Sequence, residues 1–135
     1  MFRMNVDSGA SEGHVVVSLQ GELDLVDAAG VATALEALAA RDILIIVDLS
    51  RLEFIDVAGV AALSHGRRQA RSAGGGLLLA APVPRVQRVL SFIWEGDGPG
   101  IQASVAAAVA SAESPSVRCA RRSGSLLGSA GSASP

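Results

Sequence analysis

Five consecutive apolar residues at positions 43–47 most strongly limit what this chain can fold into. Four of the five are β-branched, and an acidic residue stands on each side, Asp42 before the run and Asp48 after it. A short run of this kind is typical of a strand buried on both faces. We interpret residues 48–53 as a connector that leaves the sheet.

A helix is predicted after this connector, beginning at Asp56. The Asp56 carboxylate can accept a hydrogen bond from a free amide one turn along, which makes it a good N-cap. Small and apolar residues then recur at steps of three and four, the spacing of one buried helix face. They are Val57, Val60, Leu63, Gly66, Ala70 and Ala73. Glycines at positions 74–76 end this helix, and residues 77–81 predict a second buried strand, joined to the first as a parallel pair by a right-handed crossover.

The remaining elements are predicted from weaker patterns. A polar, glycine-containing segment separates β-favouring runs at residues 1–6 and 14–20, which indicates a hairpin. Residues 21–24 then leave the sheet, and Asp24 or Asp27 caps a helix. The buried positions of that helix are Val31, Leu35 and Leu38. Two more helices are expected, one after Pro84 and an alanine-rich one over residues 101–112, with a loop at residues 95–100 between them.

The chain of 135 residues suits one domain with a tail. Residues 114–135 are rich in Ser, Gly and Arg and cannot bury enough apolar surface to offset the entropy of ordering. We therefore predict a domain over residues 1–113 and a disordered tail after it. Residues 1–113 hold 13 acidic residues and eight arginines. This acidic balance disfavours nucleic acid as a partner, because phosphate binding needs a positive footprint.

Several function classes lack the residues they require. The chain has no apolar run of about 18 residues and no signal peptide pattern, and Cys119 is its single cysteine. We therefore expect a cytoplasmic protein that does not span a membrane. His14 and His65 stand alone, so no metal site or cofactor is expected. Asp24, Asp48 and Asp56 are explained by capping, and no Ser/His pair or Lys completes a mechanism, so the chain is not expected to be an enzyme.

Two motifs carry a resemblance to a known family. Residues 54–63, FIDVAGVAAL, resemble the signature of STAS domains, the anti-sigma factor antagonists, and residues 21–24, GELD, resemble an earlier family motif at the family's spacing. The resemblance covers residues 1–112. It implies an α/β fold, with a mixed sheet, a parallel core and about four helices packed mainly on one face.

The resemblance also implies a function. Family members are bacterial stress-response regulators that bind an anti-sigma factor of the serine protein kinase type and free a sigma factor for transcription. A monomer or weak dimer is expected, without direct contact to nucleic acid or membrane. The partner-binding residues implied for this chain are Asp24, Asp56, Val57, Ala58, Gly59 and Val60.

This chain departs from the family pattern at one position. In the family, the serine directly after the aspartate is phosphorylated by the partner, and the added charge beside acidic residues ejects that partner. Here that position is Val57, followed by Ala58, and neither side chain has a hydroxyl. We therefore expect an antagonist that is not switched by phosphorylation at this position.

Three explanations for the missing serine stay open. The protein is a constitutive antagonist, or it is controlled at another residue such as Ser50 or Ser64, or it is a diverged STAS module whose partner is not a kinase. The rival function is a non-catalytic scaffold subunit of a stress-signalling complex, and a small-molecule-binding module is the third candidate. Plain structural roles also stay open, with Asp56 as an N-cap and Gly59 as a point of close packing on the sheet.

Overall fold

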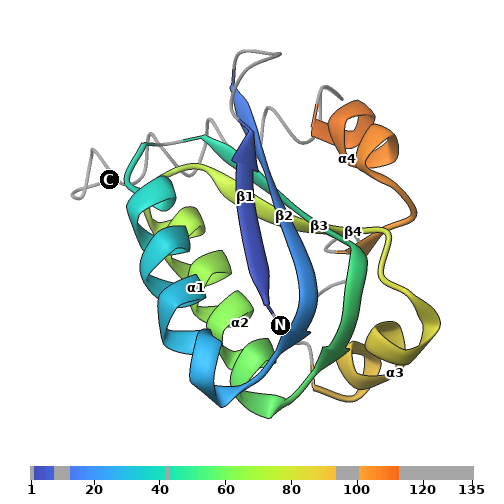
Figure 1. Ribbon diagram of the computed structural model, residues 1–135. Coiled ribbons are helices and arrows are strands. Elements are labelled where there is room, and N and C mark those ends of the chain that lie inside the picture. The colour runs from blue at the N-terminus through green and yellow to red at the C-terminus, as the bar shows by residue number, and fades with distance from the viewer. Residues whose placement is uncertain (1, 8–12, 42, 94–100, 113–135) are drawn as a thin grey trace.

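A five-stranded mixed sheet runs through the protein, as the computed structural model shows (Figure 1). The structure describes residues 2–7, 13–41, 43–93 and 101–112. The strands follow one another in chain order across the sheet. They are β1 (Arg3–Asp7), β2 (His14–Leu23), β3 (Leu44–Ile55), β4 (Gly76–Ala80) and β5 (Ile101–Gln102). The β1–β2 pair is antiparallel and the other three pairs are parallel, which confirms the hairpin and the parallel core.

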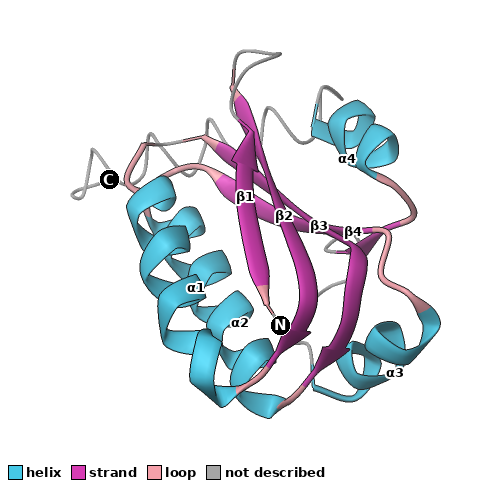
Figure 2. Ribbon diagram, viewed as in Figure 1, coloured by secondary structure: helices cyan, strands magenta, loops and turns pink. Residues whose placement is uncertain are grey.

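Within the described residues, four helices cover the sheet (Figure 2). They are α1 (Leu25–Ala39), α2 (Val57–Ser72), α3 (Pro84–Ile93) and α4 (Val105–Ala112). In the figure, α1 and α2 lie side by side at the left of the strands, and α3 and α4 lie at the right. Buried residues of α1, α2 and α3 join one large apolar cluster, whereas Ala108 of α4 belongs to a smaller cluster on the other side of β3. The expected packing mainly on one face therefore holds, with α4 on the opposite face.

The first half of β3 is buried on both faces, as its composition predicts. Ile45 and Val47 face the large cluster, and Leu44 and Ile46 face the small one. The strand does not end at Val47, however, so the predicted connector at residues 48–53 is wrong. Beyond Asp48, only one face remains buried.

The second half of β3 was not predicted as a strand, because buried and exposed residues do not alternate along it. Leu49, Leu52 and Ile55 are buried, three residues apart rather than two. The pairing with β2 shifts register twice over this segment, and each shift places an extra residue in β3. The bulges keep the strand in the sheet while they break the period of two. For its part β2 continues to Leu23, so residues 21–23 also stay in the sheet, contrary to the prediction.

Smaller corrections concern the helices. Val57 and Ala73, at the two ends of the predicted stripe of α2, are exposed, while Gly59 and Ala62 join the buried set. Leu38 of α1 is only partly buried. Residues 101–102 form β5 rather than the start of the last helix. The loop predicted at residues 95–100 and the tail predicted at residues 114–135 lie outside the described residues.

Two helix glycines should respond oppositely to alanine. A Cβ at Gly66 of α2 would lie 2.7 Å from Leu35 Cδ1 and 2.9 Å from Leu35 Cβ, whereas a Cβ at Gly30 of α1 would meet nothing within 4 Å. Gly66→Ala should therefore lower the free energy of unfolding by about 1–3 kcal/mol. Gly30→Ala should raise it by about 0.5–1 kcal/mol, because alanine favours the helix. Urea titration of both variants measures the difference, and an equal gain in both would mean that α1 and α2 are not tightly packed at Gly66.

Candidate partner-binding site

The aspartates of the two motifs, Asp24 and Asp56, lie at one edge of the sheet. β2 and β3 are parallel, and Leu23 is paired with Ile55 at their carboxyl ends. Asp24 and Asp56 follow these two residues directly, and the Asp56 amide donates a hydrogen bond to the Leu23 carbonyl oxygen (3.2 Å). Both α1 and α2 begin at this edge, at the bottom of Figure 1. The fold thus brings together two motifs that are more than 30 residues apart in the sequence.

Both aspartates act as N-caps. One carboxylate oxygen of Asp24 accepts a hydrogen bond from the Val26 amide (3.1 Å), and one of Asp56 accepts from the Gly59 amide (2.9 Å). Each bond satisfies an amide that a helix start leaves without an intrahelical partner. Capping therefore accounts for both side chains, and a role in binding needs further support.

That support comes from apolar side chains exposed beside the caps. Leu25 and Val26, in the first turn of α1, are 75% and 84% exposed, and Val57, in the first turn of α2, is 66% exposed. Phe54, near the end of β3, is also exposed. Neither the core nor the helix caps require apolar residues at these positions. We call Asp24, Leu25, Val26, Phe54, Asp56 and Val57 the helix-start edge.

The chain segments at this edge are acidic. Residues 22–27 and 53–60 carry five acidic residues and no basic residue. Exposed apolar side chains in segments that also carry polar, charged residues are typical of a protein-binding surface. The charge favours a partner with a basic surface.

The other predicted site residues lie deeper. Gly59 is buried, and a Cβ there would lie 2.7 Å from Ile55 Cγ1 and 2.9 Å from the Leu23 carbonyl oxygen. Its absence of a side chain lets α2 approach the sheet. Val60 is fully buried and Ala58 is half-buried. Val60 therefore supports the helix start from within, and in this conformation its side chain offers no surface to a partner.

Comparison with known proteins places the chain in a family. Its sequence matches the family model described as "Mlab, STAS domain" over residues 6–93, which is more than half of the chain. The chain belongs to the STAS domain family. No curated protein matches this STAS domain at a significant level.

Solved structures share its fold. An anti-sigma factor antagonist from Mycobacterium paratuberculosis has a TM-score of 0.74 and 22% identity, over 84% of this chain and 96% of that one. The anti-sigma factor antagonist SpoIIAA, in its unphosphorylated form, has a TM-score of 0.65 and 26% identity, over 81% and 93%. The murine Solute Carrier 26 family member A9 anion transporter has a TM-score of 0.65 and 20% identity, over 75% of this chain and 18% of the transporter.

Sequence reasoning missed Leu25, Val26 and Phe54 as members of the edge. Leu25 and Val26 directly follow the predicted cap Asp24, and the first turn of a helix projects past the end of the sheet, so their place in the sequence was informative. However, α1 has apolar residues on every side. The buried face of such a helix follows from its packing rather than from its periodicity.

Other candidate residues of this STAS domain lie outside the edge. His65 of α2 is not isolated, since its Nε2 lies 3.3 Å from an Oε atom of Glu36 on α1. Ser50 is exposed on β3 and Ser64 is half-buried in α2. Within the described ranges, no three His, Cys, Asp or Glu side chains are grouped to hold a metal ion. None of the helices in the described part of the chain is long and apolar enough to cross a membrane.

Removing the cap of α2 should weaken the domain measurably. Asp56→Ala leaves the Gly59 amide without its acceptor and should lower the free energy of unfolding by about 1 kcal/mol. Asp56→Asn keeps an oxygen acceptor and should cost less than half as much. Thermal and urea unfolding of the two variants test this, and an equal loss in both would show that the charge, rather than the hydrogen bond, stabilises the helix start.

Proposed function

We propose that this STAS domain is an anti-sigma factor antagonist. It binds an anti-sigma factor of the serine protein kinase type through the helix-start edge and thereby frees a sigma factor for transcription. The proposal describes a binding protein rather than an enzyme, one that acts in the bacterial cytoplasm as a monomer or weak dimer. The family membership and the match to SpoIIAA at 26% identity support it.

The exposure of Leu25, Val26 and Val57 beside the two family motifs carries the proposal. Burying the three side chains against a partner removes apolar surface from water, which favours association. The acidic surroundings then select a partner with a basic surface and exclude acidic ones. Among the residues that the resemblance names, Asp24, Asp56, Val57 and Ala58 are accessible enough to contact that partner, and Gly59 and Val60 hold the helix start in place.

Val57 makes this antagonist independent of phosphorylation at the usual position. A serine there would be exposed at a helix start, where a phosphate would add nearly two negative charges to an acidic edge. Valine cannot accept the phosphate, so the partner cannot eject the protein by this route. Valine thus removes the switch at this position, and control at another residue, such as Ser50 or Ser64, is the alternative to a constitutive antagonist.

A binding titration against the kinase-type anti-sigma factors of the same genome tests the proposal, with and without ATP. We expect the wild type to bind one of them with an affinity that ATP leaves unchanged. Val57→Ser should bind without ATP, become phosphorylated when ATP is added, and dissociate. Ala61→Ser, which adds a hydroxyl one turn further along α2 at another exposed position, is the matched control and should behave as the wild type.

A second candidate is the non-catalytic scaffold subunit, which the missing hydroxyl at Val57 also favours. A scaffold subunit would self-associate or remain in a large complex, whereas an antagonist exchanges between partners. Size-exclusion chromatography of the purified protein separates the two. If neither the wild type nor Val57→Ser binds any of the kinases, the antagonist function is wrong for this chain and the scaffold remains.

A further inference from the structure

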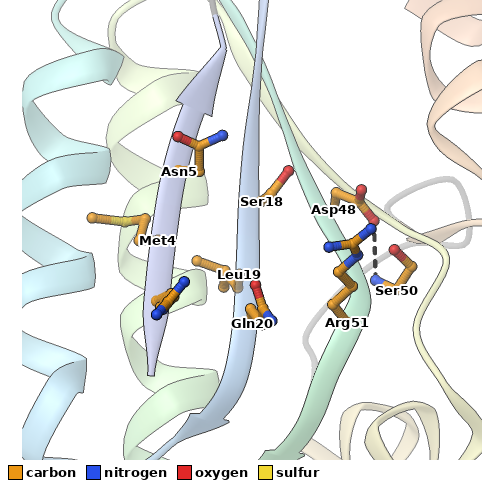
Figure 3. A pocket seen from close by; sticks show the side chains of 9 residues that line it. Met4, Asn5, Ser18, Leu19, Gln20, Asp48, Ser50 and Arg51 are labelled. Carbon is orange, nitrogen blue, oxygen red and sulfur yellow. Dashed lines mark hydrogen bonds between the residues drawn. The ribbon is translucent and has the colours of Figure 1, made fainter. Parts of the chain in front are cut away.

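The sheet face opposite α1 and α2 is partly open and polar. α4 covers only the end of that face that holds Leu44 and Ile46. Beyond it, polar side chains from three neighbouring strands line a hollow of about 660 Å³. Figure 3 shows Asn5, Ser18, Gln20, Asp48 and Arg51 together on this surface, at some distance from the helices at the left of the view.

A second hollow of about 760 Å³ adjoins the first. Gln20, Ser50 and Arg51 line both, so the two hollows are neighbours, and their linings together reach from β1 to α3. Arg3 lies in the first hollow, and Arg85 and Arg88 lie in the second. We call this surface the arginine groove, and define it by Arg3, Gln20, Ser50, Arg51, Arg85 and Arg88.

The groove concentrates positive charge on an acidic protein. It holds four of the eight arginines of residues 1–113, against two lining carboxylates, Asp48 and Glu53. All four guanidinium groups belong to exposed residues, and within the described residues none of them has an ion-pair partner. One Oδ atom of Asp48 already accepts a hydrogen bond from the Ser50 amide (3.0 Å). The net charge of the groove is therefore positive, whereas that of residues 1–113 as a whole is negative.

We propose that the arginine groove binds a small molecule that carries phosphate groups. A guanidinium presents a planar fork of N–H donors that fits two phosphate oxygens at once. The Ser50 hydroxyl and the Gln20 amide add donors beside Arg51, which lines both hollows. Each hollow has the volume of a small-molecule site. Arginines at both ends and in the middle suit a ligand with more than one anionic group.

This site is separate from the proposed function. Its lining includes none of the helix-start edge, although Glu53 and Phe54 are adjacent in sequence. A phosphorylated ligand in the groove would contact β1, β2, β3 and the start of α3 at once. The same phosphate chemistry can come from a soluble molecule or from a phospholipid headgroup, so the test includes both sources.

Isothermal titration with inorganic tripolyphosphate, at low and at moderate ionic strength, tests the proposal. We expect saturable binding by the wild type, weakened by salt because the contacts are ionic. Arg51→Gln should weaken it at least about tenfold, as should Arg85→Gln combined with Arg88→Gln, because charge-assisted bonds are lost. The matched control combines Arg68→Gln with Arg71→Gln on α2, which removes the same charge from exposed positions elsewhere, and should stay within about twofold of the wild type.

A parallel sedimentation assay uses vesicles that contain phosphatidic acid. Binding to the vesicles without binding to tripolyphosphate, with the same loss in the groove variants, would identify a lipid headgroup as the source of the phosphate. Equal losses in the groove variants and the α2 control would overturn the proposal, since they would show only a response to net charge. Absence of binding to both probes would overturn it too, as would binding of an Asp- and Glu-rich peptide alone.

Discussion

Replacing Val57 with aspartate should reduce the affinity for the kinase-type anti-sigma factor at least about 30-fold, the effect of burying an unpaired polar group in the contact. Val57 is an exposed apolar side chain that a partner would bury. A carboxylate in its place must lose its hydration without gaining a partner. It also adds a like charge to an edge that already carries Asp24 and Asp56. The change mimics part of what phosphorylation does in the family.

The same substitution should leave folding intact. Position 57 is the first residue of α2, and a negative charge in the first turn interacts favourably with the helix dipole. The midpoint of thermal unfolding should therefore stay the same or rise slightly while binding is lost. Surface plasmon resonance and thermal unfolding of one preparation measure both quantities.

Val6→Asp is the control for Val57→Asp. Val6 is another exposed valine, and it lies on β1, outside the helix-start edge. Adding an aspartate there changes the net charge equally and should leave the affinity within about threefold of the wild type, as rim or distant charges do. Wild-type affinity for Val57→Asp would contradict the proposed site, whereas equal loss in both variants would point to a general effect of charge.

Leu63→Ala should produce the largest loss of stability among simple substitutions in α2, about 2–5 kcal/mol of unfolding free energy. Leu63 is fully buried and belongs to the large apolar cluster between α2 and the sheet. Removing three carbon atoms there loses burial and leaves a cavity that the neighbours fill only in part. Urea titration should show a lower midpoint with an unchanged slope.

Leu25→Ala is the matched change on the surface. It should weaken partner binding while leaving the stability of the fold almost unchanged. Leu25 is 75% exposed, so its truncation should alter stability by less than about 0.5 kcal/mol. Its loss should weaken the anti-sigma factor complex by at least about fivefold, since the side chain belongs to the proposed contact. If Leu25→Ala destabilised the fold as much as Leu63→Ala, Leu25 would have to be buried, which would contradict its exposed position at the helix-start edge.

The sequence alone determined the features that local chemistry decides. The β-branched run at residues 43–47 predicted a strand buried on both faces, and its residues face the two apolar clusters. Asp56 was identified as a cap and Asp24 as one of two candidates, and both make the hydrogen bonds expected of a cap. Such features depend on neighbours within one turn or one strand, so the order of residues contains enough information to predict them.

The tertiary structure decided the features that depend on the register between strands and on which face a helix turns toward its neighbours. Two extra residues in β3 keep it paired with β2 up to Ile55, and no local pattern marks where a partner strand accepts a bulge. The exposure of Leu25 and Val26 follows from the way α1 packs on α2, because the apolar residues of α1 alone do not select a face. The arginine groove joins residues from β1, β3 and α3 that only the folded sheet brings together. Contacts between distant segments form surfaces that local patterns do not contain, and both proposed binding surfaces of this protein are of that kind.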